Sequence, residues 1–156
     1  MTWRQISPPV AETGTDCQFV VMACDVLSQA EEVSQRLWQL NTGALVVYGR
    51  LADLLSSPPV GRIAAVIVDT HEPLAAVRRA IEWVRHRWPG CPVTVVGDAG
   101  GGQQEMSARQ GGASFLTRPV SEEQWMSLLT HALVRQDRTG AREPPGAPRR
   151  RLSEAG

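Results

Sequence analysis

Short apolar runs alternate with amphipathic stretches along most of the chain. The runs contain few polar positions, which is typical of strands buried on both faces of a sheet. They cover residues 17–24, 44–48, 63–68, 92–96 and 114–117. We therefore predict five buried strands.

Between these runs, apolar residues recur every three or four positions, as in an amphipathic helix. The helical stretches cover residues 27–40, 51–55, 74–88, 103–110 and 121–136, of which 103–110 is the weakest. Ser121 and Gln124 form a capping-box pattern that opens the last one. Strict alternation of strands and helices predicts right-handed crossovers and a parallel sheet. The predicted fold is a three-layer, doubly wound α/β domain with five parallel strands in the flavodoxin-like order 2-1-3-4-5.

Both ends of the chain lack this pattern. Residues 1–16 show no periodicity, and residues 137–156 are rich in Arg, Pro and Gly. Such composition is typical of disorder. We predict two disordered ends that flank a single domain at residues 17–136.

Composition excludes several classes of function. Sixteen basic and sixteen acidic residues cancel, so no overall field favours nucleic acid or an anionic membrane. No apolar run is long enough to span a bilayer, and residues 1–16 do not form a secretory signal. Three cysteines, an odd number, are interpreted as free thiols, which favours a cytoplasmic location. Every basic residue is arginine, which excludes mechanisms that need a lysine amine.

The functional crevice of a doubly wound sheet lies at the carboxyl ends of its strands. Asp25 and Asp69 follow strands that are neighbours in this topology, so we expect their carboxylates to form an acidic pocket. Close carboxylates repel each other unless a proton or a cation lies between them, and Mg²⁺ prefers oxygen ligands. An aspartate beside Mg²⁺ is also able to attack a phosphoryl group. The residues expected around this crevice are Cys24, Asp25, Asp69, Gly97, Asp98 and Arg118.

Over residues 17–136 the chain resembles the receiver domain of bacterial two-component signalling. In that family an acidic pair closes the first strand, the phosphoacceptor aspartate closes the third, a Ser or Thr closes the fourth, and Lys-Pro follows the fifth. The matching residues here are Cys24-Asp25, Asp69, Gly97 and Arg118-Pro119. Residues 111–119 (GGASFLTRP) resemble the family's Gly-Ala…Tyr/Phe-Leu-Thr-Lys-Pro stretch.

The resemblance implies that Asp69 is the phosphoacceptor, that Asp25 and Asp69 hold Mg²⁺, and that Gly97, Arg118 and Pro119 occupy switch positions. Three of the matching residues depart from the family pattern. Cys24 removes a carboxylate, and Gly97 lacks the hydroxyl that would bind and report the phosphoryl group. Arg118 keeps the positive charge without the compact ammonium geometry of lysine.

From these departures we predict a divergent receiver, or pseudo-receiver, that acts in signal transduction as a protein-interaction module and not as an enzyme. Phosphorylation at Asp69 is expected to be weakened or lost. The expected partner is a histidine kinase, an output protein or a second copy of the chain, which would bind the last helices and the fifth strand. One alternative is a working Mg²⁺-dependent phosphoacceptor in a phosphorelay, with Arg118 as its cationic clamp. Another is a flavodoxin-like binder of a small ligand or cofactor.

Several residues also have simpler interpretations. Asp69 fits a solvated carboxylate, and Asp25 fits a helix cap. The glycine-rich residues 97–102 fit a flexible loop better than a phosphate cradle, because Asp98 would repel an anion. Trp83 lies off the core stripe of its helix, which suits a partner surface or packing at an edge. The arginines of the tail are expected to be solvated, with nucleic-acid binding as the minor alternative.

Overall fold

The structure, a computed structural model, describes residues 4–6, 18–40 and 43–140. Within these residues one sheet runs in the order β1-β3-β2-β4-β5-β6. Its parallel part consists of β2 (Gln18–Cys24), β3 (Ala44–Tyr48), β4 (Arg62–Asp69), β5 (Val93–Gly97) and β6 (Ser114–Thr117). The predicted order of the five parallel strands is therefore confirmed.

Two pieces of secondary structure lie outside the predicted domain at residues 17–136. β1 (Arg4–Ile6) pairs antiparallel with β3 inside the segment predicted to be disordered, and adds a sixth strand to the sheet. A three-residue edge strand held by backbone hydrogen bonds is too short to produce a hydrophobic period. At the other end, α5 (Glu122–Gly140) continues through residues 137–140, which were also predicted to be disordered. The rest of both predicted disordered ends lies outside the described residues.

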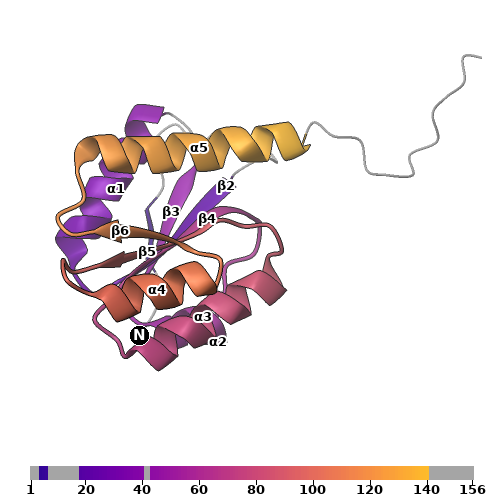
Figure 1. The fold of residues 1–156 in the computed structure, drawn as a ribbon. Helices are drawn as coiled ribbons and strands as arrows, with labels where there is room; N and C mark the ends of the chain where they lie inside the picture. The colour runs from indigo at the N-terminus through magenta and orange to yellow at the C-terminus, as the bar shows by residue number, and fades with distance from the viewer. Residues whose placement is uncertain (1–3, 7–17, 41–42, 141–156) are drawn as a thin grey trace, which may run out of the picture.

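The helices cover the sheet on both faces (Figure 1). One face carries α1 (Leu27–Leu40) and α5. The other face carries α2 (Leu51–Ser56), α3 (Leu74–Arg87) and α4 (Gly102–Gln110). Within the described residues, no helix combines the length and hydrophobicity needed to cross a membrane.

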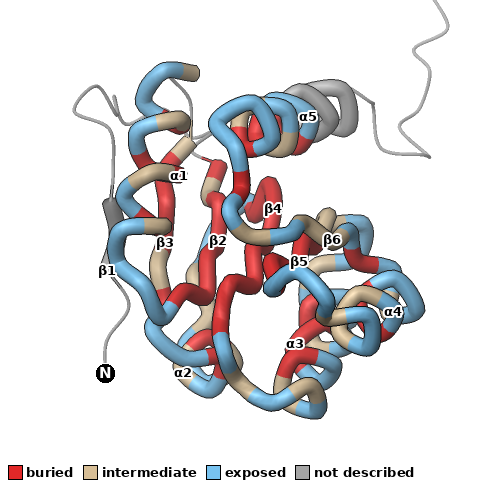
Figure 2. Tube along the Cα trace, turned by 60° about the vertical axis from the view of Figure 1, so that its left-hand side comes forward, coloured by how far each residue is buried: buried red, intermediate tan, exposed pale blue. Residues whose placement is uncertain are grey.

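Alternate residues of the central strands feed two separate cores. Val21 and Val66 face the α2, α3 and α4 side, whereas Val20, Met22 and Ile67 face the α1 and α5 side. The strands run as a buried band through the molecule (Figure 2). Burial on both faces explains why their sequences are continuous apolar runs. In the central strands β2 and β4, the polar side chains lie at the strand ends: Gln18 and Arg62 at the start, and Asp69 at the end.

Candidate functional site

The neighbouring strands β2 and β4 end side by side. Cys24 pairs with Asp69 in the parallel register, and Asp25 follows directly. At the other side of the crevice, the backbone N–H of Arg118 donates to the Gly97 carbonyl at 2.8 Å. This bond fixes the start of the segment after β6 against the end of β5. The strand ends thus meet along one edge, as predicted.

Arg118 joins two carboxylates across the crevice. Its Nε donates to Oδ1 of Asp69 at 3.0 Å, its Nη2 contacts the same oxygen, and its Nη1 donates to Oδ1 of Asp98 at 2.9 Å. Asp69 is 2% exposed, so this ion pair lies beneath the surface. Burial alone would lower the pKa of Arg118, but the bonds to Asp69 and Asp98 outweigh it and raise that pKa. The guanidinium therefore stays charged and balances Asp69 internally.

Asp25 has a different partner. Its Oδ2 accepts the backbone N–H of His71 at 3.0 Å and lies 2.9 Å from Nδ1 of the same residue. Burial raises the pKa of Asp25, but the bonds from His71 outweigh burial and lower it below 3.8. This carboxylate ties the end of β2 to the loop after β4. The sequence placed Asp25 at the crevice but gave no sign of the contact with His71.

Cys24 contributes a neutral group where the receiver family has an acid. Its side chain is buried, and Sγ donates to the Val26 carbonyl at 2.9 Å. Burial raises the pKa of this thiol to about 11. Near pH 7 it is therefore protonated, and a protonated thiol is a poor ligand for a hard cation.

These donors fit Mg²⁺ poorly. Mg²⁺ needs several oxygen ligands in octahedral geometry. Asp69 directs Oδ1 at Arg118, and Asp25 directs Oδ2 at His71. Across the part of the chain that the structure describes, no three His, Cys, Asp or Glu residues gather as a metal site. Mg²⁺ binding by Asp25 and Asp69 stays a prediction.

At Gly97, the space that a side chain would occupy is filled by the side chains of Gln104 and Phe115. A Cβ at this position would lie 2.4 Å from Oε1 of Gln104 and 2.6 and 2.8 Å from ring atoms of Phe115. A hydroxyl-bearing side chain therefore does not fit unless its neighbours move. The sequence identified Gly97 as a switch position, but it did not identify Gln104 and Phe115. In the sequence, only the glycine at position 97 and the aromatic residue shortly before Arg118 pointed to such a contact.

A cavity of about 350 Å³ opens beside Gln104. Thr70, Asp98, Gln104 and Arg118 contribute to its lining. Two buried oxygens of this region, Asp69 Oδ2 and Thr70 Oγ1, have no hydrogen-bond partner among the described residues. The crevice thus has a cavity with polar groups in its lining, although the charge of the Asp69 carboxylate is already balanced by Arg118.

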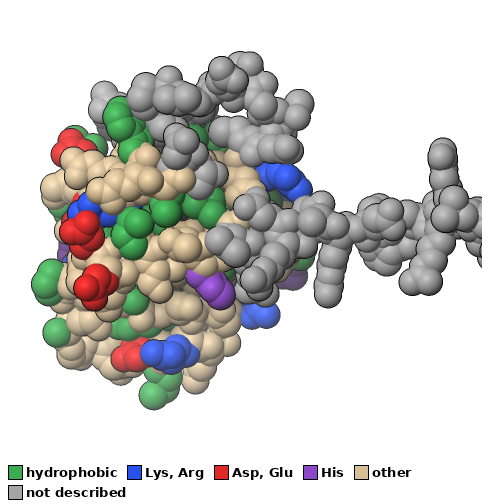
Figure 3. All heavy atoms as spheres, turned by 90° about the horizontal axis from the view of Figure 1, so that it is seen from above, with side chains coloured by type: hydrophobic (Ala, Val, Ile, Leu, Met, Phe, Trp, Pro, Cys, Tyr) green, Lys and Arg blue, Asp and Glu red, His purple; other side chains and the backbone are tan. Residues whose placement is uncertain are grey.

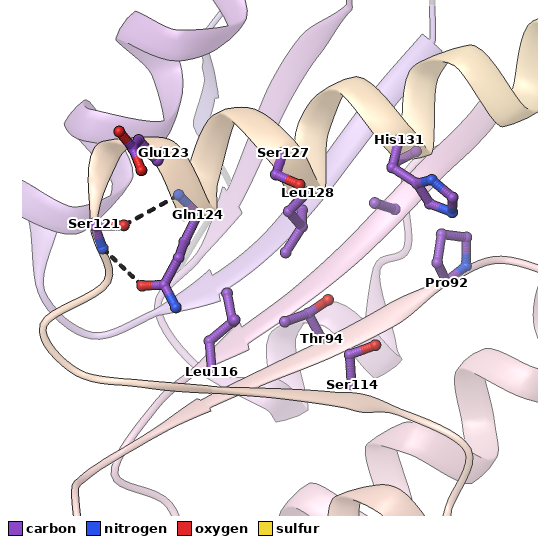
Figure 4. Close-up of a pocket in the computed structure, with 12 residues that line it drawn as sticks. Pro92, Thr94, Ser114, Leu116, Ser121, Glu123, Gln124, Ser127, Leu128 and His131 are labelled. Carbon is purple, nitrogen blue, oxygen red and sulfur yellow. Dashed lines mark hydrogen bonds between the residues drawn. The ribbon is translucent and has the colours of Figure 1, made fainter.

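A second cavity, of about 460 Å³, runs between α5 and the edge of the sheet. Leu128 points from α5 toward Thr94 and Leu116 (Figure 4). The small side chains of Ala65 and Ala132 also line the cavity. The α5 end of the cavity is fixed by the predicted capping box. Ser121 N–H donates to Gln124 Oε1 at 3.0 Å, and Gln124 N–H donates to Ser121 Oγ at 3.2 Å.

Acidic residues lie at one end of this cavity, where Arg36 of α1 also pairs with Glu122 at 3.0 Å. The first turn of α5 carries Glu122 and Glu123, and Glu123 lines the cavity. Viewed from above, acidic side chains lie toward the side where α5 begins, with hydrophobic side chains beside them (Figure 3). The cavity therefore combines an apolar floor with a polar and partly acidic rim.

Solved structures of receiver domains share the fold of this chain. The beryllofluoride-activated receiver domain of DrrB is 17% identical and superposes with a TM-score of 0.64 over 76% of this chain and 98% of its own. A CheY-like receiver domain protein of Methanospirillum hungatei is 13% identical, with a TM-score of 0.65 over 80% of this chain and all of its own. The fold is that of a response-regulator receiver domain. A chemotaxis protein of Vibrio cholerae is 17% identical and has a TM-score of 0.62 over 74% of this chain and 98% of its own.

Sequence comparison adds nothing to this structural likeness, because neither a protein-family model nor a curated protein matches the chain. Within the receiver fold, the predicted site residues divide into two groups. Asp69, Gly97 and Arg118 meet in one connected set, which Asp98, Gln104 and Phe115 complete. Asp25 belongs to a separate pair with His71. Pro119 follows Arg118 through a cis peptide bond.

Proposed function

We propose that this chain is an interaction module of a signalling system, built on the receiver fold, whose output does not depend on phosphoryl transfer to Asp69. The observation that carries the proposal is the buried ion pair between Asp69 and Arg118. The proposal also draws on the neutral thiol at Cys24 and on the glycine at position 97.

Phosphoryl acceptance makes demands that this ion pair opposes. The attacking carboxylate oxygen must reach the phosphorus atom in line, and a metal must neutralise charge on the transferring group. Here Oδ1 of Asp69 is held by Arg118, and Oδ2 is buried. Removing one partner of a buried ion pair costs about 3–5 kcal/mol. A similar cost on the way to reaction would slow phosphorylation by about a hundredfold or more, since each 1.4 kcal/mol is about a factor of ten.

The cavity between α5 and the sheet edge is the surface that we assign to the partner. Its floor accepts apolar side chains, and Glu123 at its rim suits a basic group. The partner is therefore a protein segment that carries an apolar anchor next to an arginine or a lysine. A histidine kinase, an output protein and a second copy of this chain are all sources of such a segment.

Acetyl phosphate tests the first half of the proposal. The protein is incubated with acetyl phosphate and Mg²⁺, with an ordinary receiver domain as the positive control, and analysed by intact mass. We expect no adduct under conditions that label the control. A single phosphoryl adduct that disappears in Asp69→Asn would overturn the proposal in favour of the working phosphoacceptor.

Photo-crosslinking tests the second half. A crosslinking amino acid replaces Ser127, which lines the cavity, and the adducts formed in cells of the source organism are identified by mass spectrometry. We expect one protein whose crosslinked peptide contains an apolar residue beside a basic one, and we expect His131→Trp, at an exposed position of the lining, to abolish the adduct. The matched control places the crosslinker at Gln35 of α1, which lines a different pocket. Equal adducts from both positions contradict the assignment.

A further inference from the structure

The chain itself carries a segment whose chemistry suits the cavity beside α5. Residues 144–148 read PPGAP, and Arg149, Arg150 and Arg151 follow them directly. Apolar proline rings therefore adjoin a group of positive charges in one short stretch. An apolar floor next to an acidic rim is the surface that such a stretch complements.

Glu123 supplies the negative charge at the acidic end of this cavity. Its neighbour Glu122 is already paired with Arg36 of α1. Glu123 is exposed and lines the cavity, and no ion pair joins it to another of the residues that the structure describes. A basic group from elsewhere is therefore the complement that this end of the cavity requires.

The rest of the cavity offers apolar surface. Pro92, Leu116, Leu128 and Ala132 contribute to its lining (Figure 4). A proline-rich segment adopts an extended helix whose backbone makes no internal hydrogen bonds and stays solvated. It therefore docks through its rings and does not need to pair with a strand of the sheet.

The length of the chain brings the two parts into register. α5 ends at Gly140, so the path back along the helix is about 14 Å to His131 and about 26 Å to Glu123. In the extended proline-rich conformation, the chain covers about 16 Å from Gly140 to Pro145 and about 28 Å to Arg149. A chain that reverses direction after α5 therefore brings its prolines beside the apolar lining and its arginines beside Glu123.

The covalent link makes a weak contact sufficient. A segment joined to its site by a short linker acts at an effective concentration of roughly 1 mM. A contact with an intrinsic dissociation constant of about 0.1 mM is then filled most of the time, and a competitor binds roughly tenfold more weakly. Proline also restricts the free chain, which reduces the entropy lost when the segment docks.

We propose that residues 144–151 fold back along α5 and occupy this cavity, with the prolines on its apolar floor and an arginine beside Glu123. This inference rests on the proposed function and specifies how the partner surface is regulated, because the tail competes with the partner for one cavity. The tail is then an autoinhibitory segment that the partner displaces. Its arginines are bound in part and not fully solvated.

Photo-crosslinking in the purified full chain tests where the tail lies. A crosslinking amino acid replaces Ser127, and unlabelled protein is mixed with isotope-labelled protein before irradiation. We expect an adduct within residues 144–151 whose two halves carry the same isotope, which shows a contact inside one chain. The matched control places the crosslinker at Gln35 of α1, which lines a different pocket, and should give no tail adduct.

Charge reversal tests the contact with Glu123. The triple variant Arg149→Glu/Arg150→Glu/Arg151→Glu should remove the tail adduct at Ser127. Glu123→Arg should remove it as well, and the two changes combined should restore it. The matched control is Glu82→Arg, at an exposed position of α3 on the other face of the sheet, and should leave the adduct unchanged.

A fluorescent peptide of residues 143–152 tests the competition. It should bind the variant Arg149→Ala/Arg150→Ala/Arg151→Ala about tenfold more tightly than it binds the unmodified chain, because the tail of the variant no longer fills the cavity. Fluorescence anisotropy measures both affinities. The control peptide, in which the three arginines are replaced by glutamates, should bind neither protein.

Four results overturn the inference: no tail adduct at Ser127, adducts that join two isotopes and so place a second copy in the cavity, no response to the charge reversals, or equal peptide binding to both proteins. The inference and the proposed function fail separately. A phosphoryl adduct at Asp69 refutes the proposed function and leaves the tail contact intact. A partner crosslinked at Ser127 in cells, without a tail adduct in the purified protein, refutes the inference alone.

Discussion

Arg118 is the residue on which the charge balance of the crevice depends. Its guanidinium is planar and presents several donors at once, so it contacts Asp69 through two nitrogens and still reaches Asp98. A lysine has a single ammonium group and would not span these carboxylates in the same way. An arginine at position 118 therefore makes contacts that a lysine there would not make.

Arg118→Ala should lower the free energy of unfolding by about 3–5 kcal/mol, because it leaves the Asp69 carboxylate buried without a counter-charge. Urea denaturation measures the change. The matched control is Arg109→Ala, which breaks an exposed pair with Glu105 and should cost about 0.5 kcal/mol or less. The double variant Asp69→Leu/Arg118→Met should recover part of the loss, because it removes both charges together. Equal effects at Arg118 and Arg109 would show that the buried pair contributes no more than a surface one.

The lowered pKa of Asp25 predicts that the free energy of unfolding depends on pH in the acidic range. The folded-state pKa lies below 3.8, so the ionised carboxylate stabilises the fold above that pH, and this stabilisation is lost as the pH falls through the folded-state pKa. Asp25→Asn should therefore reduce the free energy of unfolding near pH 6, and its difference from the unmodified protein should shrink below about pH 3.8. Urea titrations at several pH values measure this. Glu82→Gln, at an exposed position of α3, is the control and should show no such convergence.

At the scale of helices and strands, hydrophobic pattern predicted most of the architecture. The helix over residues 27–40 and the strands over 44–48 and 114–117 have the predicted bounds, because continuous apolar runs and regular stripes reflect burial directly. The antiparallel pairing of Arg4–Ile6 was not predictable, since it depends on backbone bonds to β3. Trp83 packs edge-on against Trp88 at 5.2 Å and is partly buried, which favours edge packing over an exposed partner surface.

Side-chain contacts at the site were harder to predict than the elements. Strand order placed Asp25 and Asp69 on neighbouring strand ends, because parallel topology alone determines that position. The directions in which the side chains of Arg118, His71 and Phe115 point depend on which neighbouring side chains leave space. The pattern of the sequence does not reveal where that space lies. The space above Gly97 is the clearest case, since Gln104 and Phe115 reach it from two other elements.

The start of α5 supports a prediction at the element scale. Ser121→Ala removes one half of the capping box and should lower the free energy of unfolding by about 1 kcal/mol. Because Ser121 and Gln124 also line the cavity beside α5, the substitution should increase amide exchange at the first turn of that helix. Ser127→Ala, which lies on the same cavity but in the middle of the helix, is the control. Loss of stability without faster exchange at the start of α5 would contradict a capping role.

At the scale of the whole molecule, the fold matches that of receiver domains, whereas several residues at its strand ends differ from the receiver pattern. Three features differ from the pattern described under Sequence analysis: Cys24 carries a neutral thiol, the space beside Gly97 is filled by Gln104 and Phe115, and Arg118 binds Asp69. Under the proposed function, we expect these features to disfavour, in this order, metal binding, sensing of a phosphoryl group and access to Asp69. A protein with all three is therefore expected to use its surface and not its crevice.

We predict that a variant with the receiver pattern at all three positions gains Mg²⁺ binding and phosphoryl acceptance. The triple variant Cys24→Asp/Gly97→Thr/Arg118→Lys should gain Mg²⁺-dependent thermal stabilisation, because two carboxylates at the end of β2 and one at β4 repel each other until a cation binds. It should also accept a phosphoryl group from acetyl phosphate, and intact mass should show the adduct. Gly97→Thr requires Phe115 and Gln104 to move, so Gln104→Ala is added in a parallel variant to make room.

Single substitutions show which residue limits Mg²⁺ binding and which limits phosphoryl acceptance. Cys24→Asp alone should gain the response to Mg²⁺ without the adduct, because Arg118 still binds Asp69. Cys24→Ser is the control that changes the side chain without adding a charge, and it should show neither effect. Asp69→Asn in the triple variant should remove the adduct. If the triple variant responds to Mg²⁺ but takes no phosphoryl group, access to Asp69 is limited by the burial of its carboxylate within the fold and not by the identity of the cation at position 118.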